Sequence, residues 1–460
     1  MIFHQFLNDD LGCACYLVGD EEAGIAVVVD PPYMIEPILE EAARRGVRIV
    51  RTIETHTHAD HVSGHGRLAL EHEIPVSVHT DAGVDYPNDP MRDGDEIEVG
   101  AVTLGVIHTP GHRPEHCCLT VVDNSRGGDP WLVLTGDSLF VGDAARPDLA
   151  VEATEGAEGL FHSLHRLMEL SDGVEVFPGH VAGSLCGKAM SSKPSTTIGF
   201  ERRFNPTLQL TEVGAFIAES ASISAPKPPN LGRIVETNRG PFVGSTPLSQ
   251  ELAAPPEAAQ LLDVRPVAAH LAGHRTGSIS VPVSGTSFGT KAGFVLDAAR
   301  PVCVLAETFD EAQSAIRGLH AVAFFAISGF VLGGGDERTD AVTVDELDAL
   351  LAAGAEVIDV REKDDRDTGY IPGSRHVPYR LLATCCPDLP TDRTVVTICD
   401  TGPRAVIAAS ILRTRGYDAR PVVDGGMIDW RARGGDTVEF RRCGSHPQER
   451  PEPRTAAADP

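Results

Sequence analysis

The sequence lacks any uninterrupted apolar run that approaches a membrane span, and its first ten residues lack the basic then apolar pattern of a secretory signal. Cysteine is also scarce, with 10 residues in 460, which excludes a disulfide framework. Lys and Arg number 39 against 66 Asp and Glu, and the net charge of −27 would repel nucleic acid and anionic membranes. We therefore expect a cytoplasmic protein with no nucleic-acid and no membrane partner.

The remaining composition is that of an ordinary globular chain. Hydrophobic residues make up 42% of the sequence and charged residues 23%. A chain of 460 residues is too long for one hydrophobic core, so we expect about three domains.

A cluster of metal-binding side chains follows the β-rich run at residues 47–53. Its sequence is Thr55-His56-Thr57-His58-Ala59-Asp60-His61. Imidazole and carboxylate groups bind borderline and hard metal ions, so the cluster predicts a metal site where a strand ends. A solvated polar loop is the alternative interpretation.

Three more such side chains follow β-like segments. Residues 102–107 lead to His112, residues 131–134 lead to Asp137, and residues 174–177 lead to His180. Strand patterns at 15–18 and 25–29 and a helical pattern at 35–42, with Gly46 as its C′ residue, indicate a layered α/β domain. Strand ends in such folds share one rim of the sheet, so we expect these groups to gather there.

These seven residues resemble the signature of the metallo-β-lactamase superfamily, His-x-His-x-Asp-His followed by a His, an Asp and a last His. The positions are filled in order by His56, His58, Asp60, His61, His112, Asp137 and His180. The resemblance covers about residues 1–215. It implies an αβ/βα sandwich with the metal at the rim of its two sheets.

The rest of the chain divides into further segments. We expect a metal domain at 1–224, with a lid segment packed over the rim at about 181–224, and a proline-rich, partly ordered linker at 225–256. An internal repeat follows, because Leu262-Asp263-Val264-Arg265 and Gly277-Ser278 recur as Ile358-Asp359-Val360-Arg361 and Gly373-Ser374. Each copy, at 257–335 and 341–437, is predicted to be a small α/β domain on a parallel sheet. The tail at 441–460 is predicted to be disordered, and Cys385-Cys386 has no interpretable motif.

The second copy contains a cysteine placed for reactivity. The apolar strand 394–398 ends at Cys399, and residues 405–412 have a helical pattern. A thiol between a strand end and a helix N-terminus meets backbone N–H groups and the positive end of the dipole, which favours the thiolate. Arg404 adds a cation nearby, so Cys399 is predicted to be a nucleophile that accepts sulfur, with a buried structural cysteine as the alternative.

The loop Cys-x-x-Gly-x-Arg resembles the active loop of rhodanese-type sulfurtransferases over about residues 341–435. The matching flanks are Asp359-Val360-Arg361, Tyr370-Ile371-Pro372-Gly373-Ser374, Gly425-Gly426-Met427 and Trp430. The resemblance implies that Cys399 and Arg404 are catalytic and that Asp400, Thr401, Gly402 and Pro403 cradle a persulfide. In the first copy Ala306 replaces the cysteine, so that copy is expected to be an inactive spacer or docking surface.

Two chemistries fit the metal signature. In binuclear hydrolases such as glyoxalase II, one zinc would be held by His56, His58 and His112 and the other by Asp60, His61 and His180, with Asp137 as the bridge. Such a pair of ions activates water and polarises a carbonyl for thioester hydrolysis.

The other chemistry is that of the superfamily's persulfide dioxygenases. The resemblance then implies one Fe(II) held by His56, His112 and Asp137, with open positions for O2 and a substrate sulfur. His58, Asp60, His61 and His180 would orient the ligands. Arg146 and Asp148 are candidates for the substrate pocket, because they resemble an Arg-x-Asp segment of these dioxygenases, although the glyoxalase branch has a similar one.

The fusion favours the dioxygenase, because a persulfide is a substrate for both domains. The resulting hypothesis is oxidation of a glutathione or coenzyme A type persulfide by O2 to sulfite and thiol, with Cys399 exchanging sulfane sulfur with thiosulfate or persulfide. The alternatives are a zinc thioester hydrolase with accessory rhodanese domains and a non-catalytic sulfur-binding or sensing protein with a structural metal domain. The sequence is compatible with a homo-oligomer and leaves the thiol carrier and the direction of transfer open.

Overall fold

The computed structural model describes residues 1–8, 10–148, 152–181, 190–221, 227–247, 249–385 and 388–439. The chain forms two compact units. The first takes Met1–His270 and Ser278–Asp336, and the second takes Leu271–Gly277 and the described residues from Glu337 onward. Parts of the expected lid (182–189 and 222–224) and of the expected linker (225, 226 and 248), Cys386 and the expected disordered tail at 441–460 lie outside the described residues.

The metal domain is built on two six-stranded mixed sheets. The first sheet has the order β1-β2-β3-β4-β5-β6, with strands at Ile2–Asn8, Cys13–Asp20, Ile25–Val29, Arg48–Ile53, Val76–His79 and Asp89–Met91. The second has the order β14-β13-β10-β9-β8-β7, with strands at Thr196–Thr197, Glu175–Pro178, Leu132–Gly136, Cys117–Asp123, Val102–His108 and Glu96–Val99. A short hairpin, β11 (Leu139–Phe140) with β12 (Asp143–Ala144), follows β10.

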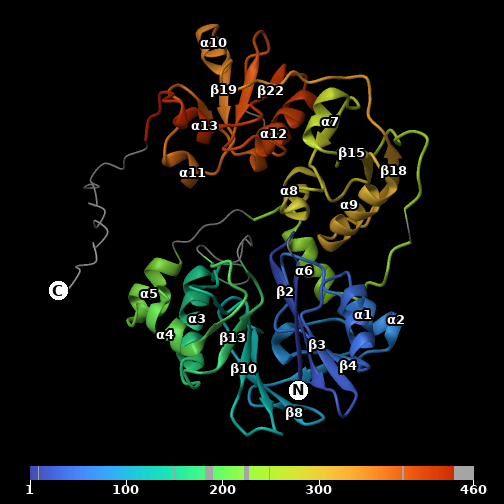
Figure 1. The fold of residues 1–460 in the computed structure, drawn as a ribbon, viewed down its shortest axis with the longest axis vertical. Helices are drawn as coiled ribbons and strands as arrows, with labels where there is room; N and C mark the ends of the chain where they lie inside the picture. Colours follow the sequence, from blue (N-terminus) through green and yellow to red (C-terminus); the bar gives the residue numbers. More distant parts are fainter. Residues whose placement is uncertain are drawn as a thin grey trace, which may run out of the picture. The chain divides into compact units, whose positions relative to one another are not determined.

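The two sheets pack face to face over one apolar core, and helices cover their outer faces. Val27, Val29 and Ile53 of the first sheet meet Leu104 and Leu119 of the second in that core. Outside the first sheet lie α1 (Glu36–Arg45) and α2 (His65–His72), and outside the second lie α3 (Ala153–Leu167), α4 (Ile198–Phe204) and α5 (Val213–Ser220). Figure 1 shows these helices on opposite sides of the layers. The expected αβ/βα sandwich is confirmed.

The described part of the expected linker, residues 227–247 and 249–256, includes a helix. It contains α6 (Leu231–Arg239), and Ile234 of this helix is buried. Asn230, just before α6, donates from Nδ2 to the Val322 carbonyl of the first repeat at 2.8 Å. The metal domain also contacts this repeat directly, since the Val62 N–H donates to the Ala321 carbonyl at 2.7 Å.

Both repeats are four-stranded parallel sheets with the same strand order, as expected from the recurring motifs. The first contains β15 (Gln260–Asp263), α7 (Val267–Ala272), β16 (Ser278–Ser280), α8 (Phe288–Val295), β17 (Val302–Ala306), α9 (Phe309–Ala321) and β18 (Ile327–Leu332). The second contains α10 (Leu347–Ala352), β19 (Glu356–Asp359), α11 (Lys363–Asp367), β20 (Arg375–His376), β21 (Val395–Ile398), α12 (Pro403–Thr414), β22 (Ala419–Pro421) and α13 (Met427–Ala432).

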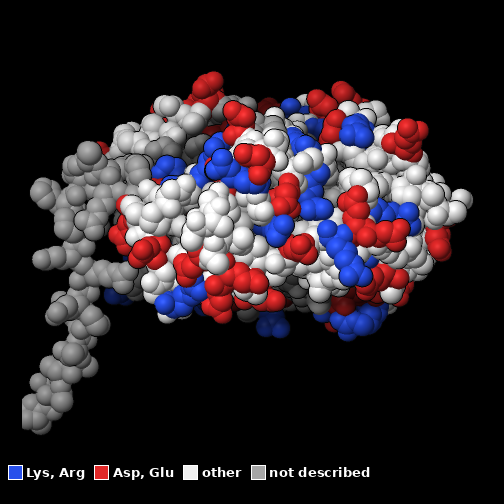
Figure 2. Space-filling view, turned by 90° about the horizontal axis from the view of Figure 1, so that it is seen from above, with Lys and Arg blue, Asp and Glu red and all other residues white. Residues whose placement is uncertain are grey.

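Other local predictions can be checked directly. Gly46 ends α1 in the left-handed conformation at φ 68°, as predicted for a C′ residue. Figure 2 shows acidic and basic side chains interspersed on the face that it displays. No helix in the described part of the chain is long and apolar enough to cross a membrane.

Candidate metal centre and cysteine loop

The residues of the predicted metal site follow the ends of strands in both sheets. His56 follows β4, and His112, Asp137 and His180 follow β8, β10 and β13 of the other sheet. One ligand atom from each of His56, His112 and Asp137 lies within 4.8 Å of the others, and all three residues are buried. Nε2 of His112 is 3.6 Å from Oδ2 of Asp137.

The hydrogen bonds at this site leave one atom of each of these three side chains available to a metal ion. The Thr55 hydroxyl donates its hydrogen to Oδ2 of Asp30 at 2.8 Å. The hydroxyl oxygen of Thr55 therefore accepts from Nδ1 of His56 at 2.9 Å, and Nε2 of His56 keeps its lone pair. Nδ1 of His112 donates to the Arg146 carbonyl at 3.1 Å, which also leaves Nε2 free.

The carboxylate completes a donor set suited to a metal ion. Oδ2 of Asp137 is buried and has no hydrogen-bond partner among the described residues. Burial and the neighbouring imidazoles lower the pKa of His56, which keeps its ring neutral as metal binding requires. Two neutral imidazole nitrogens and one carboxylate oxygen therefore fit a divalent metal.

His180 links two carboxylates at the edge of this set. Its Nδ1 lies 2.6 Å from Oδ1 of Asp137, and its Nε2 lies 2.7 Å from Oδ2 of Asp60. Although burial acts in the opposite direction, the charge of His180 holds the pKa of Asp137 below its ordinary range. The second oxygen of Asp137 is therefore engaged by His180.

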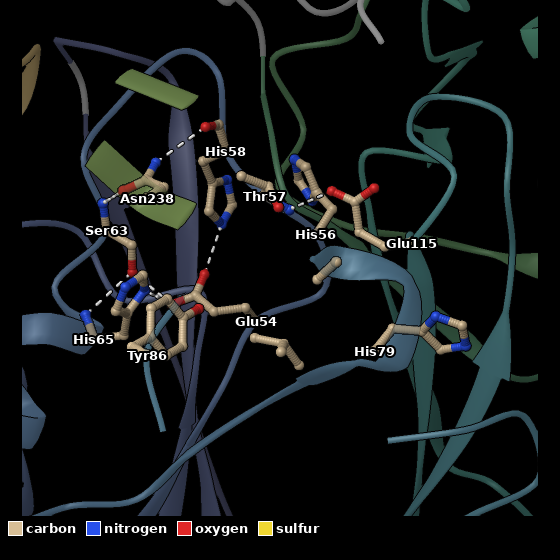
Figure 3. A pocket seen from close by; sticks show the side chains of 12 residues that line it. Glu54, His56, Thr57, His58, Ser63, His65, His79, Tyr86, Glu115 and Asn238 are labelled. Atoms are coloured by element: carbon tan, nitrogen blue, oxygen red, sulfur yellow. Dashed lines mark hydrogen bonds and ion pairs between the residues drawn. The ribbon is translucent and has the colours of Figure 1, made fainter. Parts of the chain in front are cut away.

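His58 lies beside the set, with its ring between other buried groups (Figure 3). Its Nε2 is 3.1 Å from Oε2 of Glu54 and 3.3 Å from Oδ1 of Asp30, while Nδ1 has no hydrogen-bond partner in the described structure. Burial opposes a charged ring here, but the two carboxylates outweigh it and raise the pKa of His58 well above its ordinary value. The ring stacks on His61 with centroids 4.4 Å apart.

Glu54 also anchors the start of α2. Its Oε1 accepts from the Ser63 hydroxyl at 2.5 Å and lies 3.0 Å from Nδ1 of His65. These groups line a small buried pocket beside His56, together with Tyr86 (Figure 3). Buried side chains thus hold the loop that contains His56, His58 and His61 in place.

Asn238 of α6 holds the same loop through three hydrogen bonds. Its Oδ1 accepts from the Ser63 N–H at 2.9 Å, and its Nδ2 donates to the carbonyls of His58 at 3.0 Å and His61 at 2.8 Å. Asn238 is itself buried. A helix in the proline-rich stretch therefore helps to shape the metal loop.

The substrate-pocket candidates form an ion pair with each other. Nε and one terminal nitrogen of Arg146 donate to the two oxygens of Asp148 at 2.6 and 2.8 Å. Because the Arg146 carbonyl accepts from His112, this pair positions a metal-type histidine through the backbone.

The cysteine loop has the expected position between a strand and a helix. Cys399 directly follows β21, and α12 begins at Pro403 after Gly402, whose φ is 107°. The Gly402 N–H donates to Sγ of Cys399 at 3.1 Å. The two terminal nitrogens of Arg404 bind carboxylates instead, those of Asp365 at 2.8 Å and Asp400 at 2.5 Å.

The corresponding loop of the first repeat is occupied by its own side chains. Thr308 caps α9 by accepting from the Glu311 N–H at 3.1 Å, and Glu311 accepts from the Glu307 N–H at 2.6 Å. A carboxylate thus lies where an anion would bind, and Ala306 supplies no thiol. That the first copy is inactive stays a prediction.

Comparisons with known proteins follow the same division of the chain. The profile described as "Metallo-beta-lactamase superfamily" matches residues 8–180, and that of the "Rhodanese-like domain" matches residues 343–433. "Persulfide dioxygenase ETHE1, mitochondrial" from Bos taurus is 30% identical over 236 residues, covering 48% of this chain and 82% of that protein. The Homo sapiens protein of the same name is 30% identical, with the same two coverages.

The chain belongs to the metallo-β-lactamase superfamily. Two further proteins are similar to it. A "Hydroxyacylglutathione hydrolase" from Rhizobium johnstonii is 34% identical over 168 residues, 36% of this chain and 60% of that protein. The crystal structure of a metallo-beta-lactamase from Staphylococcus aureus subsp. aureus COL has a TM-score of 0.68 and 28% identity, covering 72% of this chain and 99% of its own.

Several residues that contact the predicted metal site were not identified by the sequence analysis. Asp30 directly follows β3 and Glu54 directly follows β4, so the strand-end pattern could have identified both. His116, whose Nε2 accepts from the Asp137 N–H at 2.9 Å, shares a loop with His112. Asn238 had no such signal, because α6 lies far from the signature in sequence.

We predict that Asn238→Ala destabilises the protein and weakens metal binding. The change leaves the Ser63 N–H and the His58 and His61 carbonyls without partners, which should cost about 2–3 kcal/mol in urea unfolding of the full chain. Metal affinity should fall roughly tenfold, because the loop loses its support. Glu236→Ala, at an exposed position of the same helix, should change stability by less than about 0.5 kcal/mol. Equal effects of the two variants would contradict the assigned role.

Proposed function

We propose that the protein is an Fe(II)- and O2-dependent persulfide dioxygenase fused to a sulfurtransferase. Its metal domain would convert a low-molecular-weight thiol persulfide, O2 and water into the thiol, sulfite and two protons. The fusion supports this proposal, because a persulfide is also what the Cys399 loop would make or consume. The named persulfide dioxygenase relatives support it as well.

The observation that carries the proposal is the donor set of His56, His112 and Asp137, each with one free lone pair. An Fe(II) ion bound by two imidazoles and one carboxylate would supply open positions for O2 and for the substrate sulfur. His180 supports a single-metal site, because its two nitrogens already bind Asp137 and Asp60. These hydrogen bonds would orient Asp137 and keep Asp60 next to the site.

In this proposal, buried groups around the donor set orient its side chains. Thr55 fixes the orientation of His56 through its hydroxyl, and the Arg146 carbonyl does the same for His112. The backbone N–H of Asp137 donates to His116, which fixes the loop after β10. Such contacts exclude water from the donor atoms and hold their lone pairs in one direction.

A binuclear zinc thioester hydrolase is the second candidate. Nδ1 of His58 is buried without a hydrogen bond in the described structure, so it could serve as a further ligand beside His56 and His112 once a metal ion displaces the proton of its ring. The similarity to a hydroxyacylglutathione hydrolase also favours this reading. The two candidates differ in metal number, metal type and reaction.

Metal analysis combined with O2 uptake separates the candidates. Protein purified without added metal should carry about one iron per chain and consume O2 when cysteine or glutathione persulfide is added. Asp137→Ala should lower both the iron content and the O2 uptake at least about 100-fold, whereas the exposed His72→Ala should lower neither. Two zinc ions with thioester hydrolysis would favour the hydrolase. Unchanged activity in Asp137→Ala would favour a structural metal domain.

At the second site we propose that Cys399 carries sulfane sulfur. The Gly402 N–H and the N-terminus of α12 would stabilise the terminal sulfur of a Cys399 persulfide. Sulfane sulfur would pass through this residue between a donor and an acceptor thiol or anion.

Cys399→Ser should abolish sulfane-sulfur transfer, because the hydroxyl cannot form a persulfide. The same variant should keep persulfide-dependent O2 uptake within about twofold of the wild-type rate, since independent sites respond independently to substitution. Cys385→Ser, which alters an exposed thiol, serves as the control and should leave both reactions intact. Loss of both reactions in Cys399→Ser would show that the two domains share one obligatory intermediate.

A further inference from the structure

Two arginines beside the Cys399 loop are paired with carboxylates in the described structure. Arg404, the only arginine within the loop sequence, gives one terminal nitrogen to Asp365 of α11 and the other to Asp400 of the loop itself. Burial opposes a charged guanidinium, but Asp365 and the nearby Cys399 outweigh it and raise the pKa of Arg404. Arg404 thus lies near Cys399, while both terminal nitrogens of its guanidinium bind carboxylates.

The second arginine beside the loop is bound in the same way. Arg361 is buried and donates to both oxygens of Asp359 at 2.9 and 2.7 Å. One of its terminal nitrogens also lies 3.2 Å from Oδ1 of Asp400. Asp400 therefore bridges Arg361 and Arg404. The two arginines pair with the three carboxylates of Asp359, Asp365 and Asp400, so this group of five side chains has one net negative charge.

This charge balance affects the sulfur donors of Cys399 unequally. Thiosulfate is a small ion with two negative charges, and it needs a cation or several N–H donors to offset them. Among the described residues, the hydrogen bond to Sγ of Cys399 comes from the Gly402 backbone. A thiol persulfide has at most one negative charge at its reacting S–S group, so carboxylates nearby repel it less.

We propose that Asp365 and Asp400 are specificity-determining residues that make a thiol persulfide, rather than thiosulfate, the preferred sulfur donor of Cys399. The inference rests on the proposed sulfurtransferase function and names its substrate class. Neither aspartate would take part in bond making. Both would act by occupying Arg404 and by their own charge.

The transfer step balances without an added oxidant or reductant. The Cys399 thiolate attacks the outer sulfur of the protonated persulfide, and a new S–S bond forms while the S–S bond of the donor breaks. The electron pair of the broken bond leaves with the carrier sulfur, which takes up the proton of the persulfide. The products are a Cys399 persulfide anion and the free thiol.

The test compares two donors on the full-length protein. Second-order rate constants for persulfidation of Cys399 are measured by mass spectrometry, with cysteine persulfide and with thiosulfate, in wild type, Asp365→Asn and Asp400→Asn. Each substitution should raise the thiosulfate rate constant about tenfold, the size of a partly screened interaction between one carboxylate and a doubly charged ion. The cysteine persulfide rate constant should change less than about threefold, because its reacting group has less charge.

Asp367→Asn is the matched control, because Asp367 lies in the same helix and pairs with Lys363 rather than with Arg404. It removes the same charge and one ion pair, and it should leave the ratio of the two rate constants unchanged. A second measurement needs no variant. The wild-type rate constant with thiosulfate should rise when KCl is added, because salt screens the repulsion, and that rise should be smaller in Asp400→Asn than in Asp367→Asn.

The outcomes distinguish this inference from the proposed function. A wild-type protein that takes sulfur from thiosulfate as fast as from cysteine persulfide would overturn the inference alone. So would a donor ratio that stays constant in both aspartate variants. Absence of persulfidation by either donor would instead refute sulfur transfer at Cys399.

Discussion

The buried carboxylate of Asp30 is the contact on which the metal loop depends. It accepts from both the N–H and the hydroxyl of Thr55, at 2.7 and 2.8 Å, directly after the β4 strand. Because the hydroxyl donates to Asp30, it must accept from His56, and this determines which nitrogen of His56 remains free. One interaction between two neighbouring strands of the first sheet thus sets the chemistry of a side chain at the rim. Asp30 itself has a positive φ of 52°, an uncommon conformation held by these hydrogen bonds.

The two sites in the chain obtain their chemistry in contrasting ways. At the metal centre, buried hydrogen bonds leave lone pairs unshared, so the surroundings create donor atoms for a cation. At Cys399, carboxylates bind the terminal nitrogens of Arg404, and the Gly402 backbone N–H is the group that donates to Sγ, so the proposed persulfide would depend on backbone N–H groups. The corresponding loop of the first repeat differs, because Glu311 accepts a hydrogen bond at the start of α9 and Ala306 stands where Cys399 stands in the second repeat.

Much of the fold could be predicted because local patterns and global structure agree. Residues 25–29 form β3 as their β pattern indicated, and the helical pattern at 35–42 lies within α1, which ends at Gly46. The recurring Asp-Val-Arg and Gly-Ser motifs predicted two copies of one parallel α/β domain, and both sheets have the same strand order. The helix α6 was harder to predict, since the many prolines around it favour a linker and its burial depends on partners elsewhere in the chain.

The sequence by itself determined which kinds of donor atoms occur and that they follow strands, because residue identity and strand periodicity are local properties. It also determined that a cysteine with a glycine and an arginine in the same loop precedes a helix. Only the tertiary structure decided which atoms remain free, because the hydrogen-bond partners Asp30, Arg146 and His180 lie in other parts of the sequence. The tertiary structure likewise decided the pairing of Arg404 with Asp365 and the hydrogen bonds from Asn238 to the metal loop. Both join segments that meet only when the chain folds.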